Sequence, residues 1–342
     1  MPSAAYKTPV LILFGPTASG KTALLEELFG RAPESGGEAL GKAICRAEVI
    51  SADSMQVYRG MDIGTAKPSL EEQARIPHHL IDIRDPSEQF NAGDFVRLAG
   101  EAVYLAANRS ALPVVSGGTG FYIKNLIMGL PASPPSDPGI RSALKEELER
   151  QGAASLMKEL VRDDPVSAAR IHPNDEYRLL RALEVYRLTG RPLSSYAQNR
   201  AGEEFRFLIL GIKWDREELY KRINERCINM FKRGLPDEVK RLYEAGCTPL
   251  DPGMRAIGYR EFFVEREDAS GFPLSDQTPL TYTLTKDLAG VKALVTQNSR
   301  RYAKRQLVFF NSIPGVTWIE GKDTVKAVTE IRKKLDDFLD TP

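Results

Sequence analysis

The stretch from Gly15 to Thr22 has the residue types and the spacing of a phosphate-binding loop. It reads GPTASGKT, which matches the pattern G-x-x-x-x-G-K-[ST], and it lies between the apolar run Val10–Phe14 and an amphipathic stretch. A loop of this kind, placed between a strand and a helix, turns backbone N–H groups towards phosphate oxygens. We therefore predict that Lys21 neutralises two phosphates of a ligand and that the hydroxyl of Thr22 binds Mg²⁺.

Asp53 follows a second short apolar run, Val49–Ser51, and so lies just past the end of a predicted strand. A carboxylate in this place can bind magnesium, or it can act as a general base towards a substrate in front of the phosphates. It can also cap the N-terminus of a helix. The residues around Asp53 leave these three roles open.

Two further features could also meet a phosphate. Gly117-Gly118 stands between a predicted strand and a predicted helix, where it would let a phosphate or a polynucleotide approach the backbone. Arg222 and Arg226 are four residues apart and share one face of a predicted helix. One of them could reach the phosphates as an arginine clamp, although ion pairs with Glu218 or Glu225 are the simpler interpretation of the spacing alone.

Cations gather in three places along the chain. Arg178 and Arg181 lie on one helix face, and the segment Arg255–Arg260 has an arginine at each end. The stretch QNSRRYAKRQ has four more cations around Tyr302. Cations beside an aromatic ring suit phosphates and a stacked base, whereas a single charged helix face is more often simply solvated. Three such clusters in a chain with a phosphate loop favour an RNA ligand.

Composition limits the class of protein. The chain has 342 residues, of which 42% are hydrophobic and 27% charged, and its formal net charge is +1. Global charge therefore argues neither for nor against nucleic acid. The three cysteines form no CxxC pair, and with three histidines no zinc site is legible. Free thiols, no signal-peptide pattern and no run of the ~20 apolar residues that span a membrane lead us to expect a cytoplasmic protein without a membrane partner.

The elements that must position these residues alternate between strands and helices. Short apolar runs are expected to form strands at Val10–Phe14, Val49–Ser51, Leu80–Ile83, Pro113–Val115 and Leu208–Trp214. With helix-period stretches between most of them, they predict an α/β fold with a parallel sheet. Ligands bind at the carboxyl ends of strands in such sheets, so the phosphate loop, Asp53 and Gly117-Gly118-Thr119 would meet at one edge.

A proline-rich connection divides the chain. Four prolines lie between Pro131 and Pro138, and residues 141–196 have helical periodicity almost throughout. We expect a P-loop NTPase-like parallel sheet core from residues 1–130 and 206–342, interrupted by a helical insertion domain at 131–205. Glu265–Leu280 is expected to be a polar surface loop.

Motifs from about Pro9 to about Trp318 resemble those of the tRNA dimethylallyltransferases, also called tRNA isopentenyltransferases. In order they are GPTASGKT, DSMQVYRGMDIGTAKP, HHLID with FNAGDF, GGTGFYIKNLIMGL, NDEYRLLRALEVYRLTGRPLS, GMRAIGYREF and RRYAKRQLVFF. The resemblance implies transfer of a dimethylallyl group from its diphosphate to N6 of the adenosine 3′ of the anticodon, in tRNAs that read codons beginning with U. The phosphate loop would then hold a diphosphate leaving group rather than a nucleoside triphosphate.

The resemblance also implies a role for each site residue. Asp53 would be the general base that accepts the proton of the adenine amine, and Arg226 matches the family's catalytic arginine. Lys21, Thr22 with its Mg²⁺ and the loop N–H groups would share with Arg226 the stabilisation of the departing diphosphate. The diphosphate-binding residues would be Gly15, Pro16, Thr17, Ala18, Ser19, Gly20, Lys21 and Thr22.

The tRNA contacts carry over by matching residues, and the helical insertion would clamp the anticodon stem. They are Asp53, Ser54, Met55, Gln56, Thr119, Arg141, Tyr177, Arg178, Leu179, Leu180, Arg181, Arg255, Ala256, Ile257, Gly258, Tyr259 and Arg260. Many family members have Gln-Arg where this chain has Tyr177-Arg178, so a polar base contact is lost or replaced by stacking. The expected partners are a tRNA anticodon stem-loop and dimethylallyl diphosphate, bound by a monomer.

Three other functions fit parts of the pattern. A P-loop kinase would use Asp53 as its base or metal ligand and would consume ATP. A prenyltransferase acting on free adenine nucleotides would need neither the basic clusters nor the insertion. A non-catalytic RNA-binding switch would bind tRNA in a nucleotide-dependent way without making product.

Overall fold

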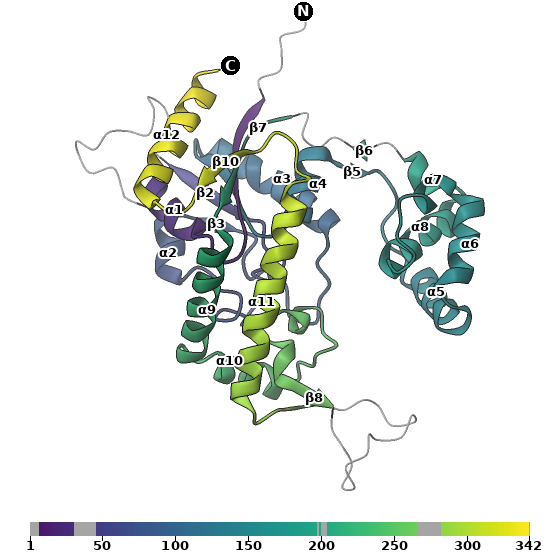
Figure 1. The fold of residues 1–342 in the computed structure, drawn as a ribbon. Helices are drawn as coiled ribbons and strands as arrows, with labels where there is room; N and C mark the ends of the chain where they lie inside the picture. Colours follow the sequence, from purple (N-terminus) through teal and green to yellow (C-terminus); the bar gives the residue numbers. More distant parts are fainter. Residues whose placement is uncertain (1–6, 31–45, 197, 200–203, 266–281, 342) are drawn as a thin grey trace, which may run out of the picture. The chain divides into compact units, whose positions relative to one another are not determined.

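The computed structural model of the chain describes residues 7–30, 46–196, 198–199, 204–265 and 282–341 (Figure 1). It divides into two compact units, one made of residues 1–127 and 202–342 and the other of residues 128–201. Cys45 and nearly all of the expected polar loop Glu265–Leu280 lie outside the described residues.

The first unit is built on a six-stranded parallel sheet with the strand order β10-β7-β1-β4-β2-β3. Its strands are β1 (Thr8–Phe14), β2 (Ala47–Ser51), β3 (His78–His79), β4 (Leu112–Gly117), β7 (Phe205–Lys213) and β10 (Thr317–Glu320). In the central strand β1, Ile12 pairs with Val115 of β4 on one side and with Ile209 of β7 on the other. The predicted α/β fold with a parallel sheet is confirmed.

Helices cover both faces of this sheet. They are α1 (Lys21–Phe29), α3 (Ala92–Asn108), α4 (Gly120–Met128), α9 (Arg216–Lys232), α11 (Leu288–Phe310) and α12 (Thr324–Asp340). Leu11 and Leu13 of β1 pack in a core with α1 and α12, whereas Ile12 and Phe14 pack in a second core with the other four helices. A strand buried on both faces needs a continuous apolar run, which explains the sequence VLILF.

The prediction of a strand at Leu80–Ile83 is wrong. The edge strand β3 is His78–His79, and the chain turns directly after it, with φ of 63° at Leu80 and 55° at Asp82. The N–H groups of residues 82 and 83 donate to the carbonyls of residues 56 and 57 in the loop after β2, so they are not available to a strand. Tertiary hydrogen bonds therefore override the β-branched pattern at this edge.

The smaller elements of the first unit lie beyond the carboxyl edge of the sheet or at its margins. They are α2 (Leu70–Arg75), α10 (Leu235–Glu244), the 3-10 turns η3 (Gly253–Arg255) and η4 (Arg260–Phe262), and the antiparallel pair β8 (Phe263–Glu265) and β9 (Tyr282–Leu284). Among the helices that the structure describes, none is long and apolar enough to cross a membrane.

The second unit is a small helical bundle with its own core. Its elements are β5 (Leu130–Pro131), α5 (Pro138–Gln151), α6 (Ala153–Asp163), α7 (Pro165–Ala168), α8 (Glu176–Thr189), η1 (Leu193–Ser195) and β6 (Gln198–Asn199). Leu144, Leu160, Leu179 and Leu183 are fully buried between α5, α6 and α8. Asp137 caps α5 directly before Pro138, so the proline-rich connection ends where this helix begins.

Candidate active site

The first unit contains a cavity of about 780 Å³ at the carboxyl ends of its central strands. Its walls come from the phosphate loop, the loop after β2, the turn at residues 64–66, α9, residues 255–257 and α11. The predicted residues that line it are Thr17, Ala18, Ser19, Gly20, Lys21, Thr22, Asp53, Ser54, Met55, Gln56, Arg226, Arg255, Ala256, Ile257 and Arg260. The other predicted residues of this unit, Gly15, Pro16, Thr119, Gly258 and Tyr259, are not among its lining residues.

The phosphate loop holds a cation that has no counter-ion among the described residues. Ala18 and Gly20 have φ of 64° and 87°, and α1 begins directly afterwards at Lys21. The Lys21 ammonium donates to the carbonyls of Gly15 (2.9 Å) and Pro16 (3.1 Å) and makes no ion pair among the described residues. Burial and, to a smaller extent, the charge of Arg226 lower the pKa of Lys21 to about 8, while the charge of Asp53 opposes the shift. An anion in the cavity would relieve this cost.

Arg226 is a second cation in the cavity, and no carboxylate in the described part of the chain forms an ion pair with it. It is half-buried on α9, and its Nη2 donates to the carbonyl of Thr65 at 3.4 Å. Burial lowers the pKa of Arg226, while the charge of Asp53 opposes this. The alternative ion pairs with Glu218 and Glu225 do not form, because within the described chain Glu218 pairs with Lys221 (2.8 Å) and Arg226 has no ion pair.

Residues remote in the sequence hold the phosphate loop from outside. The Nε of Arg222 donates to the carbonyl of Ala18 (2.8 Å), and the indole of Trp214 donates to the carbonyl of Ser19 (3.0 Å). The Arg222 guanidinium also lies 4.3 Å from the centre of the Trp214 ring. One cationic and one aromatic side chain thus fix the loop backbone before any ligand binds. This reduces the free-energy cost of ordering the loop on binding.

Gln306 of α11 joins the phosphate loop to the loop after β4. Its side-chain carbonyl accepts the N–H of Thr17 (2.9 Å), and its amide donates to the carbonyl of Gly118 (2.7 Å). Sequence reasoning missed the roles of Trp214, Arg222 and Gln306. Gln306 lies within the quoted motif RRYAKRQLVFF and could have been singled out there, whereas no local spacing connects Trp214 with the loop.

Asp53 caps the turn that follows β2 and faces the cavity. Its Oδ1 accepts the N–H groups of Met55 (2.9 Å) and Gln56 (3.4 Å), and Oδ2 accepts no hydrogen bond from the described residues. No helix follows this turn, so the helix-cap role that the sequence left open does not apply. One oxygen of Asp53 therefore fixes the side chain while the other is available to a ligand.

Asp53 stands next to the glycine loop after β4. The N–H of Ser54 donates to the Thr119 hydroxyl (3.0 Å), and the N–H of Thr119 donates to the carbonyl of Ala52 (3.1 Å). A Cβ at Gly117 would lie 2.1 Å from that same carbonyl, so only glycine permits this approach. Tyr302 reaches the site from α11, hydrogen-bonded to Thr119 and Gln306, and burial with the charge of Asp53 raises its pKa to about 12.

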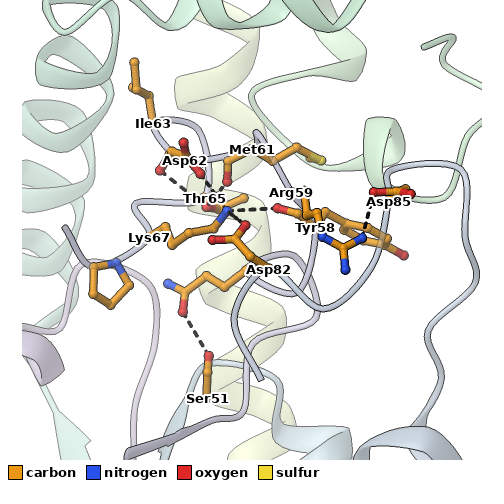
Figure 2. A network of polar contacts seen from close by, with 12 residues as sticks. Ser51, Tyr58, Arg59, Met61, Asp62, Ile63, Thr65, Lys67, Asp82 and Asp85 are labelled. Carbon is orange, nitrogen blue, oxygen red and sulfur yellow. Dashed lines mark hydrogen bonds and ion pairs between the residues drawn. The ribbon is translucent and has the colours of Figure 1, made fainter. Parts of the chain in front are cut away.

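A buried lysine holds the loop between Asp53 and the turn at residues 62–66 (Figure 2). The ammonium of Lys67 contacts the carbonyl of Tyr58 (2.9 Å), Asp62 (2.6 Å) and Asp82 (2.5 Å). The hydroxyl of Ser51 donates to the side-chain carbonyl of Gln56 at 2.9 Å. Lys67 thereby supports the left-handed backbone at Asp82 and fixes the loop that carries Gln56.

Only some side chains of the segment Arg255–Arg260 are accessible to a ligand. Arg255 and Arg260 are exposed and line the cavity, whereas Tyr259 is fully buried and donates to Glu238 (2.7 Å). Ala256 is also almost fully buried. Among the side chains of this segment, only those of the two arginines and Ile257 are therefore accessible to a ligand, and the buried residues shape the segment.

The predicted residues of the helical unit divide in the same way. Tyr177 and Arg178 are exposed, but Leu179 and Leu180 are buried in the bundle core and cannot offer their side chains to tRNA. Arg181 pairs with the fully buried Glu184 at 2.9 Å, and Arg141 pairs with the same carboxylate at 3.3 Å. Burial alone would raise the pKa of Glu184, but hydrogen bonds from Ser136 and Arg181 hold it below its usual value.

Arg141 also lies 4.8 Å from the centre of the Tyr177 ring. This contact turns the exposed ring into a surface with a cation beneath it, which suits stacking of a nucleic-acid base. Helical spacing put Arg178 and Arg181 on one face of α8 but could not show that Arg181 pairs with the buried Glu184.

The predicted magnesium ligand fits the ion only in part. Thr22 is exposed at the start of α1 and lines the cavity. No group of three His, Cys, Asp or Glu residues among those described could hold a metal by itself. Mg²⁺ keeps several waters and is commonly bound through one or two protein oxygens together with substrate phosphates. Thr22 therefore suits a magnesium ion that arrives with a diphosphate.

The family model described as IPP transferase matches residues 56–313. This chain belongs to the IPP transferase family. Among its relatives, the tRNA dimethylallyltransferase of Geobacter sulfurreducens is 44% identical over 97% of this chain and 98% of that protein. The enzyme of the same name from Geobacter metallireducens is 45% identical over 92% of this chain and 93% of that protein.

Solved structures of IPP transferases have the same fold. The tRNA isopentenylpyrophosphate transferase of Bacillus halodurans is 35% identical in sequence. The match covers 98% of this chain and 97% of that protein's chain, with a TM-score of 0.64. A eukaryotic dimethylallyltransferase acting on tRNA is 25% identical over 97% of this chain and 80% of its own, with a TM-score of 0.73. This IPP transferase is therefore an enzyme, as the sequence predicted.

Proposed function

We propose that this IPP transferase moves a dimethylallyl group from dimethylallyl diphosphate to N6 of the adenosine 3′ of the anticodon, in tRNAs that read codons beginning with U. The products are N6-dimethylallyladenosine in tRNA and diphosphate. One observation carries the proposal: Lys21 and Arg226, which form no ion pair with any described residue, share a cavity with the carboxylate of Asp53. The names of the relatives supply the substrate class.

The phosphate loop would bind the diphosphate of the donor. Its backbone N–H groups, Lys21 and Arg226 offer hydrogen bonds and charge at the point where negative charge grows as the C–O bond to the leaving group breaks. Because the loop is already held by Arg222, Trp214 and Gln306, little reorganisation is needed at that moment. Magnesium, bound by Thr22 together with the diphosphate, would further neutralise the leaving group.

Asp53 would act on the acceptor. The exocyclic amine of adenine is a poor nucleophile, because its lone pair is delocalised into the ring. As its nitrogen attacks the allylic carbon, the amine must lose a proton, and Oδ2 of Asp53 can accept it. The base must leave the anticodon-loop stack to reach Asp53, at a cost of a few kcal/mol.

The tRNA would be held by residues of both units. In the first unit these are the cavity-lining residues Ser54, Met55, Gln56, Arg255, Ile257 and Arg260, with Thr119 supporting Ser54. In the helical unit they are Tyr177 and Arg178, with Arg141 beneath the ring. We propose that the enzyme acts as a monomer. We place the enzyme in the cytoplasm, where its tRNA substrate is found.

The deciding experiment is incubation with tRNA, dimethylallyl diphosphate and Mg²⁺, followed by nucleoside analysis by mass spectrometry. Parallel reactions contain AMP in place of tRNA, or ATP with a labelled γ-phosphate. We expect dimethylallyladenosine from tRNA alone and no transfer of label. Product from AMP, consumption of ATP, or tRNA binding without product would each overturn the proposal in favour of one of the three other functions.

A further inference from the structure

Glu238 is a buried carboxylate outside the cavity that binds the turn at residues 62–64. It lies on α10, is 1% exposed and is not a lining residue. Its oxygens accept the N–H groups of Asp62 (3.1 Å), Ile63 (2.8 Å) and Gly64 (3.1 Å). No ion pair joins Glu238 to a cation within the described chain, so these donors are what compensates its burial.

The fourth donor to Glu238 comes from the predicted tRNA-binding segment. The hydroxyl of Tyr259 donates to Oε1 at 2.7 Å, and burial raises the pKa of Tyr259, so the phenol keeps its proton. The Tyr259 ring also packs on the turn itself, because a Cβ at Gly64 would lie 2.4 Å from the ring. Glu238 therefore ties Arg255–Arg260 to the turn through one carboxylate.

The turn in its own right presents carbonyls to the cavity. The carbonyl of Thr65, next to Gly64, accepts Nη2 of Arg226 at 3.4 Å, and that of Ala66 accepts the side-chain amide of Gln56 at 3.3 Å. At its other end the turn is anchored by the ion pair between Lys67 and Asp62. Where the turn sits therefore determines where these two side chains point.

We propose that Glu238 is a positioning residue for Arg226, acting through the turn at residues 62–66. Tyr259 connects Glu238 to the predicted tRNA-binding segment Arg255–Arg260. The inference rests on the proposed function and extends it to residues that touch neither substrate. In this proposal α10, through Glu238, holds Arg226 next to the diphosphate leaving group. Binding of tRNA against Arg255 and Arg260 would then stabilise the same arrangement that the diphosphate needs.

A double-mutant cycle on the full-length enzyme tests this proposal. Glu238→Gln keeps the shape of the side chain but turns an amide donor towards backbone N–H donors. Two quantities are measured for wild type, E238Q, Arg226→Ala and the double variant: the affinity for inorganic diphosphate with Mg²⁺, and the single-turnover rate with saturating tRNA. We expect E238Q to lower the rate roughly 10- to 100-fold, because small displacements of a catalytic group have effects of that size.

The decisive comparison is between the two backgrounds. If Glu238 acts through Arg226, E238Q should change either quantity by no more than about twofold once Arg226 is absent. If E238Q changed the affinity or the rate by the same factor in wild type and in Arg226→Ala, the proposal would be overturned. Tyr259→Phe keeps the ring and should show the same non-additivity with a smaller loss, which preserves the test if E238Q does not fold.

Asp164→Asn is the matched control for the loss of a buried carboxylate. Asp164 is fully buried in the helical unit and accepts hydrogen bonds from Ser167 and Ser194, two of them from backbone N–H groups at 3.0 and 2.9 Å. We expect D164N to lower the melting temperature without changing diphosphate affinity. Since the diphosphate arm of the cycle needs no prenylated product, failure of the proposed function and failure of this inference are distinguishable.

Discussion

Thr17 and Gln306 are 289 positions apart in the sequence, yet the N–H of Thr17 donates to the Gln306 side chain at 2.9 Å. The same side chain donates to the carbonyl of Gly118, so one amide joins the phosphate loop to the loop after β4. Removing it would leave the N–H of Thr17 without an acceptor among the described residues, whereas the carbonyl of Gly118 would keep the N–H of Gly120 at 3.1 Å.

Gln306→Leu should therefore destabilise the enzyme by about 1–3 kcal/mol, the cost of leaving the Thr17 donor unpaired. Affinity for diphosphate should fall as well, because the phosphate loop loses its contact with α11. Denaturant unfolding and calorimetric titration measure the two effects. Gln297→Leu, at an exposed position of the same helix, is the control and should change neither quantity. If Q306L were as stable as wild type, the hydrogen bonds of Gln306 to Thr17 and Gly118 would not contribute to stability.

Asp53→Asn should lower prenylation at least ~10²-fold, because the amide cannot accept the proton of the amine. Its carbonyl can still accept the N–H groups of Met55 and Gln56, so the turn and the binding of tRNA should survive. Nucleoside analysis and gel shift measure the two properties separately. Near-normal turnover in D53N would remove Asp53 from the role of general base.

Lys21 should make diphosphate binding pH-dependent in a defined direction. Burial lowers its pKa from 10.5 to about 8 in the folded enzyme. Above pH 8 the free enzyme has a neutral amine at the loop, so the affinity advantage of wild type over Lys21→Met should shrink as pH rises. Calorimetric titrations of both proteins between pH 6.5 and 9.5, chosen as about 1.5 units on either side of this pKa, measure the difference.

The same shift has the opposite effect on folding. Between pH 8 and 10.5 the unfolded chain still binds the proton that the folded chain has lost, so the stability of wild type relative to K21M should rise with pH in that interval. Below pH 8 the cost of burying the charged amine is fully present. A constant difference in unfolding free energy across this range would contradict the assigned burial of Lys21.

Arg178 and Arg181 should behave differently although they share a helix. Arg178→Ala removes an exposed cation and should reduce the slope of log K against log salt for tRNA by about 1, with unchanged stability. Arg181→Ala should instead destabilise the helical unit by about 1–3 kcal/mol, because the buried Glu184 keeps only Arg141 and its neighbouring donors. Filter binding at several salt concentrations and thermal unfolding separate the two effects.

Arg162→Ala is the control for this pair, since Arg162 is an exposed cation of the same unit that pairs with Asp163. It should leave both the salt slope and the unfolding temperature unchanged. Identical behaviour of all three variants would assign Arg178 to an ordinary solvated face.

The parts of the site that could be predicted from sequence are those encoded over a few adjacent residues. The phosphate loop is contiguous, and its strand and helix flanks are visible as an apolar run and an amphipathic stretch. Asp53 could be placed at the carboxyl edge because it directly follows a β-branched strand. These features depend on local backbone geometry, which the residue order determines.

What the sequence could not show depends on contacts between distant segments. The apolar pattern at Leu80–Ile83 favours a strand, yet hydrogen bonds to residues 56 and 57 bend it away. Glu238 and Gln306 resemble ordinary helix residues until the folded chain places backbone donors and acceptors around them. Helical spacing put Arg178 and Arg181 on one face, but the buried Glu184 that captures Arg181 is visible only in the packed bundle.

The order of β1 and its neighbours has a consequence for how the protein is made. β1 emerges from the ribosome early, but β7, which completes its pairing, and Gln306, which steadies the phosphate loop, are translated only after residues 128–201. That intervening segment is continuous and contains its own leucine core, so it can fold while synthesis continues. The nascent protein should thus acquire its helical unit first and gain the capacity to hold an anion last, when α11 leaves the exit tunnel.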